Sequence, residues 1–394
     1  MARSGIFRQT RMGYPAFIPA NLPPDPPVNL DGGLGYLLSR ADQALGAINT
    51  IATILPNPEL LVAMFIQKEA LLSSQIEGTQ SSLIDVLGVD EDSEPIEDVG
   101  EVVNYIKAMR YGLRRIHEDE FPMSLRLLKE IHGILMQQVR GGKPPLTPGE
   151  FRRSQNWIGG TNPNNARYVP PPPEEMQASL DNLEKYMHDE QETPVLIRCA
   201  LIHYQFETIH PFNDGNGRLG RLLIIFFLVW QGVLNEPMLY LSAYLKTHQQ
   251  EYYDRLQQVR TGGNFEAWVQ FFLEGVVTVS DQVVKTTKAI QQLEKTDTDR
   301  VLKGYSGHAG VLLLRYLMEQ PVVRVRDIEQ RIKVSYSKAN NIIREFEHIG
   351  ILKQITKGRR NRKFIYEQYI NILSEGTEPL LYELGVTSHV GQTQ

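Results

Sequence analysis

The sequence has almost no cysteine and no long apolar run, and both absences narrow the class of protein. Cys199 is the single cysteine among 394 residues, which excludes an intramolecular disulfide framework and a cysteine zinc site. The longest apolar run, 222–230, is far shorter than the roughly 20 residues that span a bilayer. Residues 1–5 lack the apolar core of a signal peptide. We therefore expect a globular, cytoplasmic protein without a membrane segment.

The net charge of −5 is small, but the charges are unevenly distributed along the chain. Residues 310–373 contain 13 Lys and Arg against 6 Asp and Glu, a net charge of +7, which leaves −12 on the remainder. The overall composition, 42% hydrophobic and 22% charged, is that of an ordinary globular protein and excludes global disorder. The basic C-terminal part is the one we expect to select a partner.

Hydrophobic periodicity predicts a mainly α-helical body. Apolar residues recur every three or four positions from about residue 33 to residue 293. The proline cluster between residues 14 and 28 predicts an extended arm, because proline fixes φ and lacks a backbone donor. The segment 144–173, rich in Gly, Asn and Pro, interrupts the helices, and residues 156–158 and 167–169 within it predict a β-hairpin with a long tip.

The end of the chain predicts a second, smaller domain after a charged separating stretch, 294–304. Three short helices are expected there, followed by two strands around a basic turn, 357–362. The helices are predicted at 311–318, 325–332 and 338–349, and the strands at 351–356 and 363–366. This order resembles a winged helix-turn-helix domain. Its basic turn suits DNA phosphates, but many such modules bind protein, and both partners stay open.

The most informative segment is 210–221, His-Pro-Phe-Asn-Asp-Gly-Asn-Gly-Arg-Leu-Gly-Arg. A helix is expected to end near Ile209, because Pro211 cannot continue it. A tight turn over residues 215–217 then leads to a second apolar helix that begins near Arg218. Backbone N–H groups at that helix start, freed from side-chain bulk by two glycines, predict an anion cradle.

The side chains around this turn predict polyphosphate chemistry. Arg218 and Arg221 are three residues apart and can both face the cradle, where two guanidinium groups suit phosphates. Asp214 could hold the Mg²⁺ that accompanies such phosphates, and His210 at the rim suits the acceptance of a hydroxyl proton. The alternative, a plain loop with a capping asparagine, leaves this set of complementary groups unexplained.

His-Pro-Phe-x-Asp-Gly-Asn-Gly-Arg-x-x-Arg is the signature of Fic-domain proteins, and this chain matches it at every defined position. The resemblance covers roughly residues 30–290 and implies a helical Fic core with a β-hairpin flap at 155–171 that aligns a target segment. It also implies transfer of AMP from ATP and Mg²⁺ to a Ser, Thr or Tyr hydroxyl of a protein, which can be the chain itself. The Doc-like kinase branch has lysine in place of Gly217 and lacks the final arginine, so Gly217 and Arg221 favour adenylyl transfer over phosphorylation.

The resemblance also implies roles for individual residues. It makes His210 the general base and Asp214 the metal ligand, with Phe212 anchoring the loop in the core. The ATP-binding residues it implies are Gly215, Asn216, Gly217, Arg218, Leu219, Gly220 and Arg221 around the phosphates, with Tyr252 and Tyr253 lining the adenine pocket. We interpret Trp157 and Tyr168 of the flap, and His203 on the preceding helix, as packing or structural residues.

A second segment, 73–78, resembles the inhibitory helix pattern of the family, Ser/Thr-x-x-x-Glu-Gly/Asn. Gly78 is expected to end a helix and leave Glu77 in its last turn, where the helix dipole mildly opposes a carboxylate. A partner cation would compensate, and the resemblance makes Arg221 that cation, with Ser73 in the same motif. Such a pair would occupy the arginine that the γ-phosphate needs and would misorient ATP.

The resulting division is an N-terminal arm and helical region with the inhibitory motif (1–100), a Fic catalytic core (101–293), a winged helix-turn-helix (305–373) and a tail (374–394). Two alternative functions stay open: a DNA-binding regulator that uses the Fic fold as an ATP sensor, and the reverse reaction, in which Glu77 activates water to remove AMP. The sequence is compatible with a monomer or a homodimer.

Overall fold

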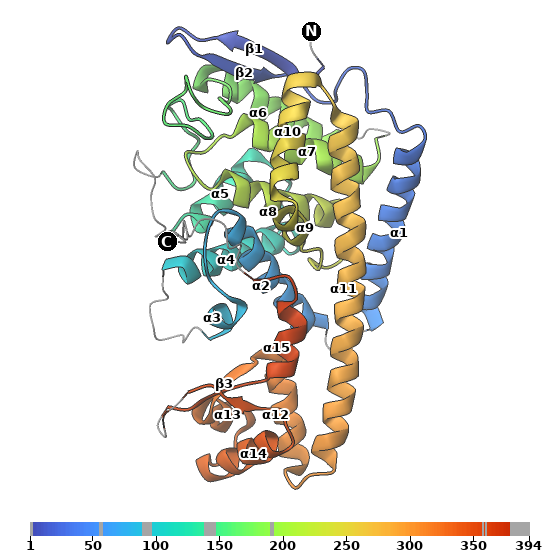
Figure 1. The fold of residues 1–394 in the computed structure, drawn as a ribbon, viewed down its shortest axis with the longest axis vertical. Helices are drawn as coiled ribbons and strands as arrows, with labels where there is room; N and C mark the ends of the chain where they lie inside the picture. Colours follow the sequence, from blue (N-terminus) through green and yellow to red (C-terminus); the bar gives the residue numbers. More distant parts are fainter. Residues whose placement is uncertain are drawn as a thin grey trace, which may run out of the picture.

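The computed structural model describes residues 3–54, 58–88, 97–137, 147–189, 193–356, 358 and 361–378. A large helical body carries a small C-terminal module at one end, and the long helix α11 (Phe265–Leu302) runs along both (Figure 1). The predicted mainly α-helical class is confirmed. No helix of the described residues is long and apolar enough to cross a membrane.

The N-terminal arm is extended, as the prolines predict. Strands β1 (Gly5–Gln9) and β2 (Pro15–Pro19) form an antiparallel hairpin in which Ile6 lies opposite Ile18. The backbone N–H of Phe17 donates to the carbonyl of Val169 (2.9 Å), which attaches the arm to the irregular 147–172 segment. After the arm, helix α1 (Gly33–Ile54) packs along α11.

Two apolar helices form the centre of the body. Helices α7 (Val195–Ile209) and α8 (Asn216–Trp230) are buried on nearly every face, as expected for helices that are hydrophobic all round. The helices that complete the body are α2 (Pro58–Ile76), α3 (Leu83–Leu87), α4 (Glu97–His117), α5 (Leu125–Leu135), α6 (Pro173–His188), α9 (Ser242–Thr247) and α10 (Gln249–Gly262). The loop between α7 and α8 is therefore held between two buried helices.

The predicted hairpin at 156–169 is reduced to a single antiparallel bridge. Ile158 and Tyr168 exchange both backbone hydrogen bonds, and no strand forms on either side of them. The tip is instead organised by asparagine: Asn165 Oδ1 accepts from the backbone N–H groups of Thr161 and Asn162. These local side-chain hydrogen bonds compete with the backbone hydrogen bonds of a β-ladder. The predicted hairpin therefore does not extend into regular strands.

The C-terminal module has its three helices close to the predicted positions: α12 (Gly307–Glu319), α13 (Val325–Ile332) and α14 (Tyr336–His348). The sequence analysis missed β3 (Val322–Arg324), which pairs with β5 (Lys363–Ile365); β5 also pairs with β4 (Lys353–Gln354). Helix α15 (Glu367–Ser374) follows. Of the predicted basic turn, residues 357, 359 and 360 lie outside the described residues, as do residues 379–394 of the predicted tail.

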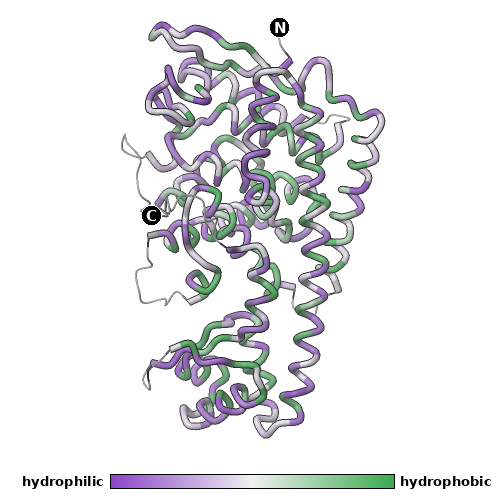
Figure 2. Tube along the Cα trace, viewed as in Figure 1, coloured by the Kyte–Doolittle hydropathy of each residue, from purple (hydrophilic) through white to green (hydrophobic). Residues whose placement is uncertain are grey.

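The charged stretch 294–304, predicted to separate the two parts, is mostly helical, because α11 continues through Leu302. Within it, Asp297 and Val301 are buried, and α11 packs against α12 and α15 of the C-terminal module. Hydrophilic and hydrophobic residues alternate along α11 (Figure 2). Asp297 is fully buried and accepts from Tyr366 Oη at 2.6 Å and from Arg300 at 2.9 Å. The helix thus joins the module to the body through buried contacts.

Replacing Tyr366 with phenylalanine is expected to destabilise this junction by about 2 kcal/mol, because a buried carboxylate loses one of its hydrogen-bond donors. Chemical denaturation followed by circular dichroism measures the change, and Tyr305→Phe, at a tyrosine that is 75% exposed, is the control. Equal stabilities of the two variants would show that the Asp297–Tyr366 bond does not hold the junction.

Candidate active site

The loop between α7 and α8 begins and ends on left-handed residues. His210 terminates α7 with φ 50° and ψ 60°, and its backbone N–H still donates to the carbonyl of Phe206. Gly215 (φ 77°) precedes α8, which begins at Asn216, two residues earlier than predicted. The predicted helix end near Ile209 is therefore confirmed, whereas the turn predicted over residues 215–217 is wrong for residues 216 and 217, which belong to α8.

Asn216 holds the loop rather than facing a ligand. Its Oδ1 accepts from the backbone N–H of Phe212 and its Nδ2 donates to the Phe212 carbonyl, both at 2.8 Å. Phe212 is fully buried, as expected for an anchor. Both side-chain groups of Asn216 are satisfied inside the loop, which leaves only its backbone for the predicted contact with phosphate.

His132 of α5 supports the same loop, and the sequence analysis missed it. Its Nδ1 accepts from the backbone N–H of Gly149 (2.9 Å), so the proton lies on Nε2, which donates to the Asp214 carbonyl (3.0 Å). The ring also stacks on Phe212, with centroids 3.7 Å apart. Burial lowers the pKa of His132 to about 4, so the neutral tautomer persists near pH 7.

Arg152 is a second missed residue, and it fixes the backbone of His210. Its guanidinium is 2% exposed and donates to the carbonyls of His210 (2.9 Å), Pro171 (2.6 Å) and Ser154 (3.2 Å). Asn156 Nδ2 also donates to the His210 carbonyl (3.2 Å). The 147–172 segment is therefore tied directly to the predicted catalytic residue.

His210 lies in a strongly positive, desolvated setting. Burial lowers its pKa to about 3, and Arg152 and Arg260 add to this effect, while Glu77 opposes it. Its imidazole is therefore neutral at physiological pH and can accept a proton.

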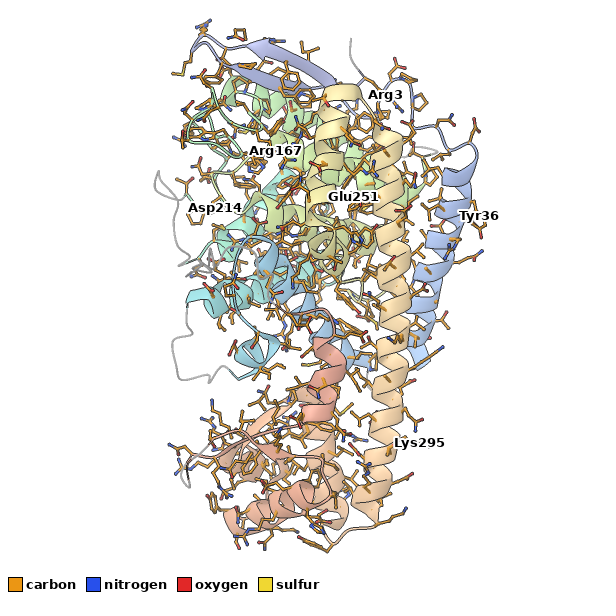
Figure 3. The ribbon with its side chains drawn as sticks, in the orientation of Figure 1. Arg3, Tyr36, Arg167, Asp214, Glu251 and Lys295 are labelled. Carbon is orange, nitrogen blue, oxygen red and sulfur yellow. The ribbon has the colours of Figure 1, made fainter. Side chains whose placement is uncertain are left out.

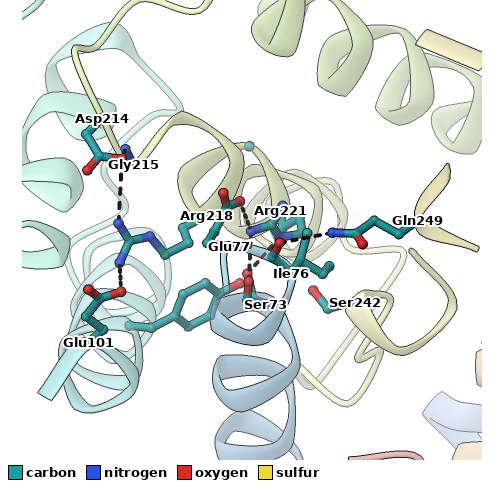
Figure 4. Close-up of polar contacts among 12 residues, drawn as sticks. Ser73, Ile76, Glu77, Glu101, Asp214, Gly215, Arg218, Arg221, Ser242 and Gln249 are labelled. Carbon is teal, nitrogen blue, oxygen red and sulfur yellow. Dashed lines mark hydrogen bonds and ion pairs between the residues drawn. The ribbon is translucent and has the colours of Figure 1, made fainter. Parts of the chain in front are cut away.

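Glu77 and Arg221 form the ion pair that the resemblance implies (Figure 4). Arg221 Nη2 lies 2.6 Å from Glu77 Oε1, and its Nε donates to Ser73 Oγ (2.7 Å). Arg221 is 2% exposed and Glu77 is 35% exposed, so the arginine is shielded and the carboxylate lies at the pocket edge. Although burial opposes the shift, Arg221 holds the pKa of Glu77 below its usual value. Helix α2 ends at Ile76, immediately before Glu77.

Gly217 provides the space for this pair. A Cβ atom on residue 217 would lie 2.3 Å from Glu77 Oε1 and 3.0 Å from Arg221 Nη1. A side chain there would make the Glu77 carboxylate shift, so glycine at residue 217 leaves room for an anionic oxygen at the first turn of α8.

Arg218 is directed away from the pair, toward a residue that the sequence analysis missed. Its Nη1 lies 2.8 Å from Glu101 Oε2 on α4, while its Nη2 is 3.8 Å from Asp214 Oδ1 (Figure 4). Burial raises the pKa of Glu101, and Arg218 opposes that shift. Asp214 is 42% exposed and its Oδ1 accepts from the backbone N–H of Gly215 (2.6 Å). Within the described residues, no three His, Cys, Asp or Glu side chains gather as a metal cluster.

A pocket of about 510 Å³ opens beside His210, Glu77 and Arg221. Its other walls come from the 147–172 segment, α7 and α10. The lining includes Trp157, Ile158, Arg167, Glu207, Gly217, Tyr252, Tyr253, Leu256 and Arg260. Both predicted tyrosines therefore line the pocket. Arg167 lies beside α10 (Figure 3), and it pairs with Asp254 of that helix at 2.6 Å.

Two of the packing interpretations hold and one is wrong. His203 is buried; its Nδ1 donates to the Gly220 carbonyl (2.9 Å), and its Nε2 accepts from Tyr252 Oη (2.8 Å). Tyr168 is buried and donates to the Thr208 carbonyl (2.6 Å). Trp157 is 39% exposed and lines the pocket, so its interpretation as a packing residue is wrong.

Leu219 and Gly220, predicted among the ATP-binding residues, lie behind the pocket wall. Leu219 is fully buried in the core. A Cβ atom on residue 220 would lie 2.3 Å from Glu207 Oε1, so Gly220 packs against α7. The helical period explains why Leu219 and Gly220 do not line the pocket. Within residues 217–221 of α8, only residues 217 and 221 lie on the face toward the pocket. Glu207 itself was missed; burial raises its pKa to about 7.

Residues 36–114 match the Fic/DOC family N-terminal model, and residues 122–228 match the Fic/DOC family model. The protein adenylyltransferase Fic of Aedes aegypti is 31% identical over 249 residues, which cover 60% of this chain and 45% of that protein. The protein of the same name from Culex quinquefasciatus is 32% identical over 222 residues, which cover 53% of this chain and 40% of that protein. The chain thus spans less than half the length of these curated relatives.

Two solved structures have the same fold. A Fic family protein from Desulfovibrio desulfuricans G20 has a TM-score of 0.54 at 18% identity, with 84% of this chain and 95% of that chain covered. A Fic domain containing signaling protein from Bacteroides thetaiotaomicron has a TM-score of 0.50 at 17% identity, with 63% and 98% covered. Residues 36–114 and 122–228 of this chain are therefore a Fic/DOC family N-terminal segment and a Fic/DOC family segment.

Proposed function

We propose that this protein transfers AMP from ATP to a Ser, Thr or Tyr hydroxyl of a protein, which can be itself, and that Glu77 holds the activity down. The observation that carries the proposal is the Glu77–Arg221 pair, which lies beside His210 at the mouth of a pocket of about 510 Å³. The relatives named protein adenylyltransferase Fic support the same reaction class.

The pocket suits a nucleoside triphosphate. The start of α8 offers backbone N–H groups, and Gly217 leaves space there that an oxygen of Glu77 now fills. A terminal phosphate in that place would receive the Arg221 guanidinium, whose planar donors match phosphate oxygens. Tyr253, which is 36% exposed, offers aromatic surface to the base, and the buried Tyr252 packs behind it with ring centroids 5.1 Å apart.

Asp214 suits Mg²⁺, because it offers an exposed carboxylate at the start of the phosphate-binding turn. Mg²⁺ at nucleotide sites is held by one or two carboxylates together with phosphate oxygens, so a cluster of protein ligands is not required. When bound, the ion would neutralise phosphate charge. Arg218 lies nearby but is held by Glu101, so we assign it to positioning this end of the loop.

His210 is the proposed general base. As the target oxygen forms a bond to the α-phosphorus, the hydroxyl proton passes to the neutral imidazole. The bond from that phosphorus to the β-phosphate oxygen breaks, and pyrophosphate leaves with the electron pair. Burial lowers the pKa of His210 and two nearby guanidinium groups lower it further, so bound phosphate charges should raise it toward its usual value and improve the base.

Glu77 is proposed to inhibit by occupying Arg221. The carboxylate oxygen lies where a phosphate oxygen would bind, and both anions compete for one guanidinium. This pairing also argues against AMP removal by Glu77, because Arg221 holds the carboxylate oxygen at 2.6 Å and takes up a lone pair that would activate water.

A DNA-binding regulator is the second candidate, favoured by the surface of α14. Ser337, Lys338, Asn341 and Arg344 are exposed on this helix of a module with a net charge of +7 over residues 310–373. DNA binding of this kind would weaken steeply with salt and would persist in His210→Ala. It is compatible with AMP transfer by the body.

Glu77→Gly is expected to increase AMP incorporation by between about 5- and 150-fold, because it releases Arg221 for the terminal phosphate. Intact-mass analysis after incubation with ATP and Mg²⁺ measures AMP added to the chain itself, and labelled ATP in a lysate measures AMP added to other proteins.

The matched control is Glu59→Gly, the same substitution at an exposed residue in the first turn of the same helix. Glu59→Gly should behave as the unmodified chain does. If Glu77→Gly incorporated no more AMP than Glu59→Gly in either assay, the proposed inhibition would be wrong.

A further inference from the structure

A short segment after the last helix binds across the inhibitory helix. Residues 375–378, which we name the C-terminal strap, follow α15 and lie against α2 and α9. Three side chains donate to its main-chain carbonyls. The bonds join Lys68 Nζ to Glu375 O (2.8 Å), Gln75 Nε2 to Thr377 O (2.9 Å) and Lys246 Nζ to Glu378 O.

These three donors are unusual because they are buried. Lys68, Gln75 and Lys246 are 2%, 4% and 5% exposed, and buried amine or amide groups are stable only when they have partners. Burial lowers the pKa of Lys68 to about 8, and the Glu375 and Glu378 carboxylates oppose that shift. Without the strap, each of the three side chains would lose an acceptor.

Gln75 connects the strap to the inhibitory motif. Besides Thr377, its Nε2 donates to the Ser81 carbonyl (2.9 Å), and its Oε1 accepts from Lys246 (2.7 Å). Gln75 lies between Ser73 and Glu77, the residues that contact Arg221. The last turn of α2 is therefore held by the strap on one face and by Arg221 on another.

We propose that the buried donors of α2 and α9 form a peptide-binding surface whose occupant is the chain's own strap, and that its occupancy holds Glu77 against Arg221. This surface binds main-chain carbonyls, so it recognises the backbone of the turn at residues 375–378 rather than particular side chains. The expected effect of the strap on AMP incorporation rests on the inhibitory role proposed for Glu77. Its expected effect on the stability of the last turn of α2 does not depend on that role.

The strap also links α2 to the basic C-terminal module. It begins where α15, the last described helix of the module, ends, and the Thr377 N–H donates back to the Ser374 carbonyl (2.9 Å). Gly376 makes the turn with φ +81°, and a Cβ atom there would meet nothing within 4 Å. A partner that draws the module away from the body would withdraw the strap and loosen the end of α2.

Gly376→Val in the full-length chain tests the proposal, because a β-branched residue disfavours the left-handed turn without creating a collision. Gly350→Val is the matched control, since Gly350 has φ +75°, also has nothing within 4 Å, and lies in the C-terminal module. Hydrogen exchange of the amides of residues 73–77 is the primary measurement, and AMP incorporation is the second.

In Gly376→Val, those amides are expected to exchange at least about fivefold faster than in Gly350→Val. AMP incorporation should rise by about threefold or more yet stay below that of Glu77→Gly, and combining the two substitutions should add nothing to Glu77→Gly alone. Lys246→Met, which removes one donor, should shift both measurements in the same direction.

If the amides of residues 73–77 exchanged at an unchanged rate in both Gly376→Val and Lys246→Met, the strap would not hold the end of α2, whatever the AMP incorporation of the two variants. If exchange became faster and Glu77→Gly were activated, but Gly376→Val incorporated no more AMP than Gly350→Val, the strap would not regulate activity. If Glu77→Gly itself were not activated, the proposed inhibition would have failed, and the exchange measurement would still decide whether the strap holds the end of α2.

Discussion

Replacing His210 with alanine in the Glu77→Gly background is expected to lower AMP incorporation by about 10²- to 10⁴-fold, the usual contribution of a general base. The imidazole is neutral near pH 7 and lines the pocket beside Arg221. Its backbone is held by Arg152 and Asn156, so removing the ring should leave the loop in place. Initial rates with labelled ATP and Mg²⁺ measure the loss.

The control is His308→Ala, an exposed histidine at the start of α12, which should keep the activity of its parent. Nucleotide binding separates chemistry from folding: His210→Ala should bind a labelled ATP analogue within about threefold of its parent, because the phosphate contacts remain. Incorporation at the parent rate would show that another residue accepts the hydroxyl proton.

Replacing Arg152 with methionine is expected to destabilise the body by about 3 kcal/mol or more, because several carbonyls lose a charged donor inside the protein. It should also lower AMP incorporation by about 10- to 100-fold at temperatures where the variant stays folded, since the His210 backbone is then free to shift. Arg152 acts through His210 and contacts no proposed substrate atom, so it is a positioning residue.

Arg153→Met is the matched control, because Arg153 is the exposed neighbour of Arg152 and carries the same charge. It should change stability by less than about 0.5 kcal/mol. Arg152→Lys should recover some of the stability but little of the activity, since an ammonium cannot reproduce the planar contacts to three carbonyls. Full activity in Arg152→Met would show that the loop does not depend on this residue.

Local chemistry made the loop and its flanking helices predictable. Pro211 ends α7, Gly215 allows the left-handed turn, and the apolar run after residue 218 forms a buried helix. The Glu77–Arg221 contact was also anticipated, but through the family resemblance, because the two residues are 144 positions apart. Spacing alone carries no information about a contact at that separation.

Several of the errors arise because the direction of a side chain depends on the tertiary structure. Leu219 and Gly220 share the motif with Arg221 but face the core, and Arg218 turns to Glu101 on another helix. His132 and Arg152 support the loop from separate segments, and no local pattern marks them. Trp157 looked like a packing residue because its segment was read as a regular hairpin, whereas the asparagine-rich tip leaves only one bridge.

By itself, the sequence determined the helical class, the elements around residues 210–221 and the charge difference between body and module. These follow from backbone restrictions, the periodicity of apolar residues and composition, all of which act over a few residues or sum over many. The tertiary structure alone decided that α11 is continuous through the predicted separating stretch, that Glu101 takes Arg218, and that buried donors on α2 and α9 bind residues 375–378. Those outcomes depend on which donors and acceptors, distant in sequence, form hydrogen bonds with one another when they are buried. The partners are determined only in the folded chain, because only there are these groups removed from water.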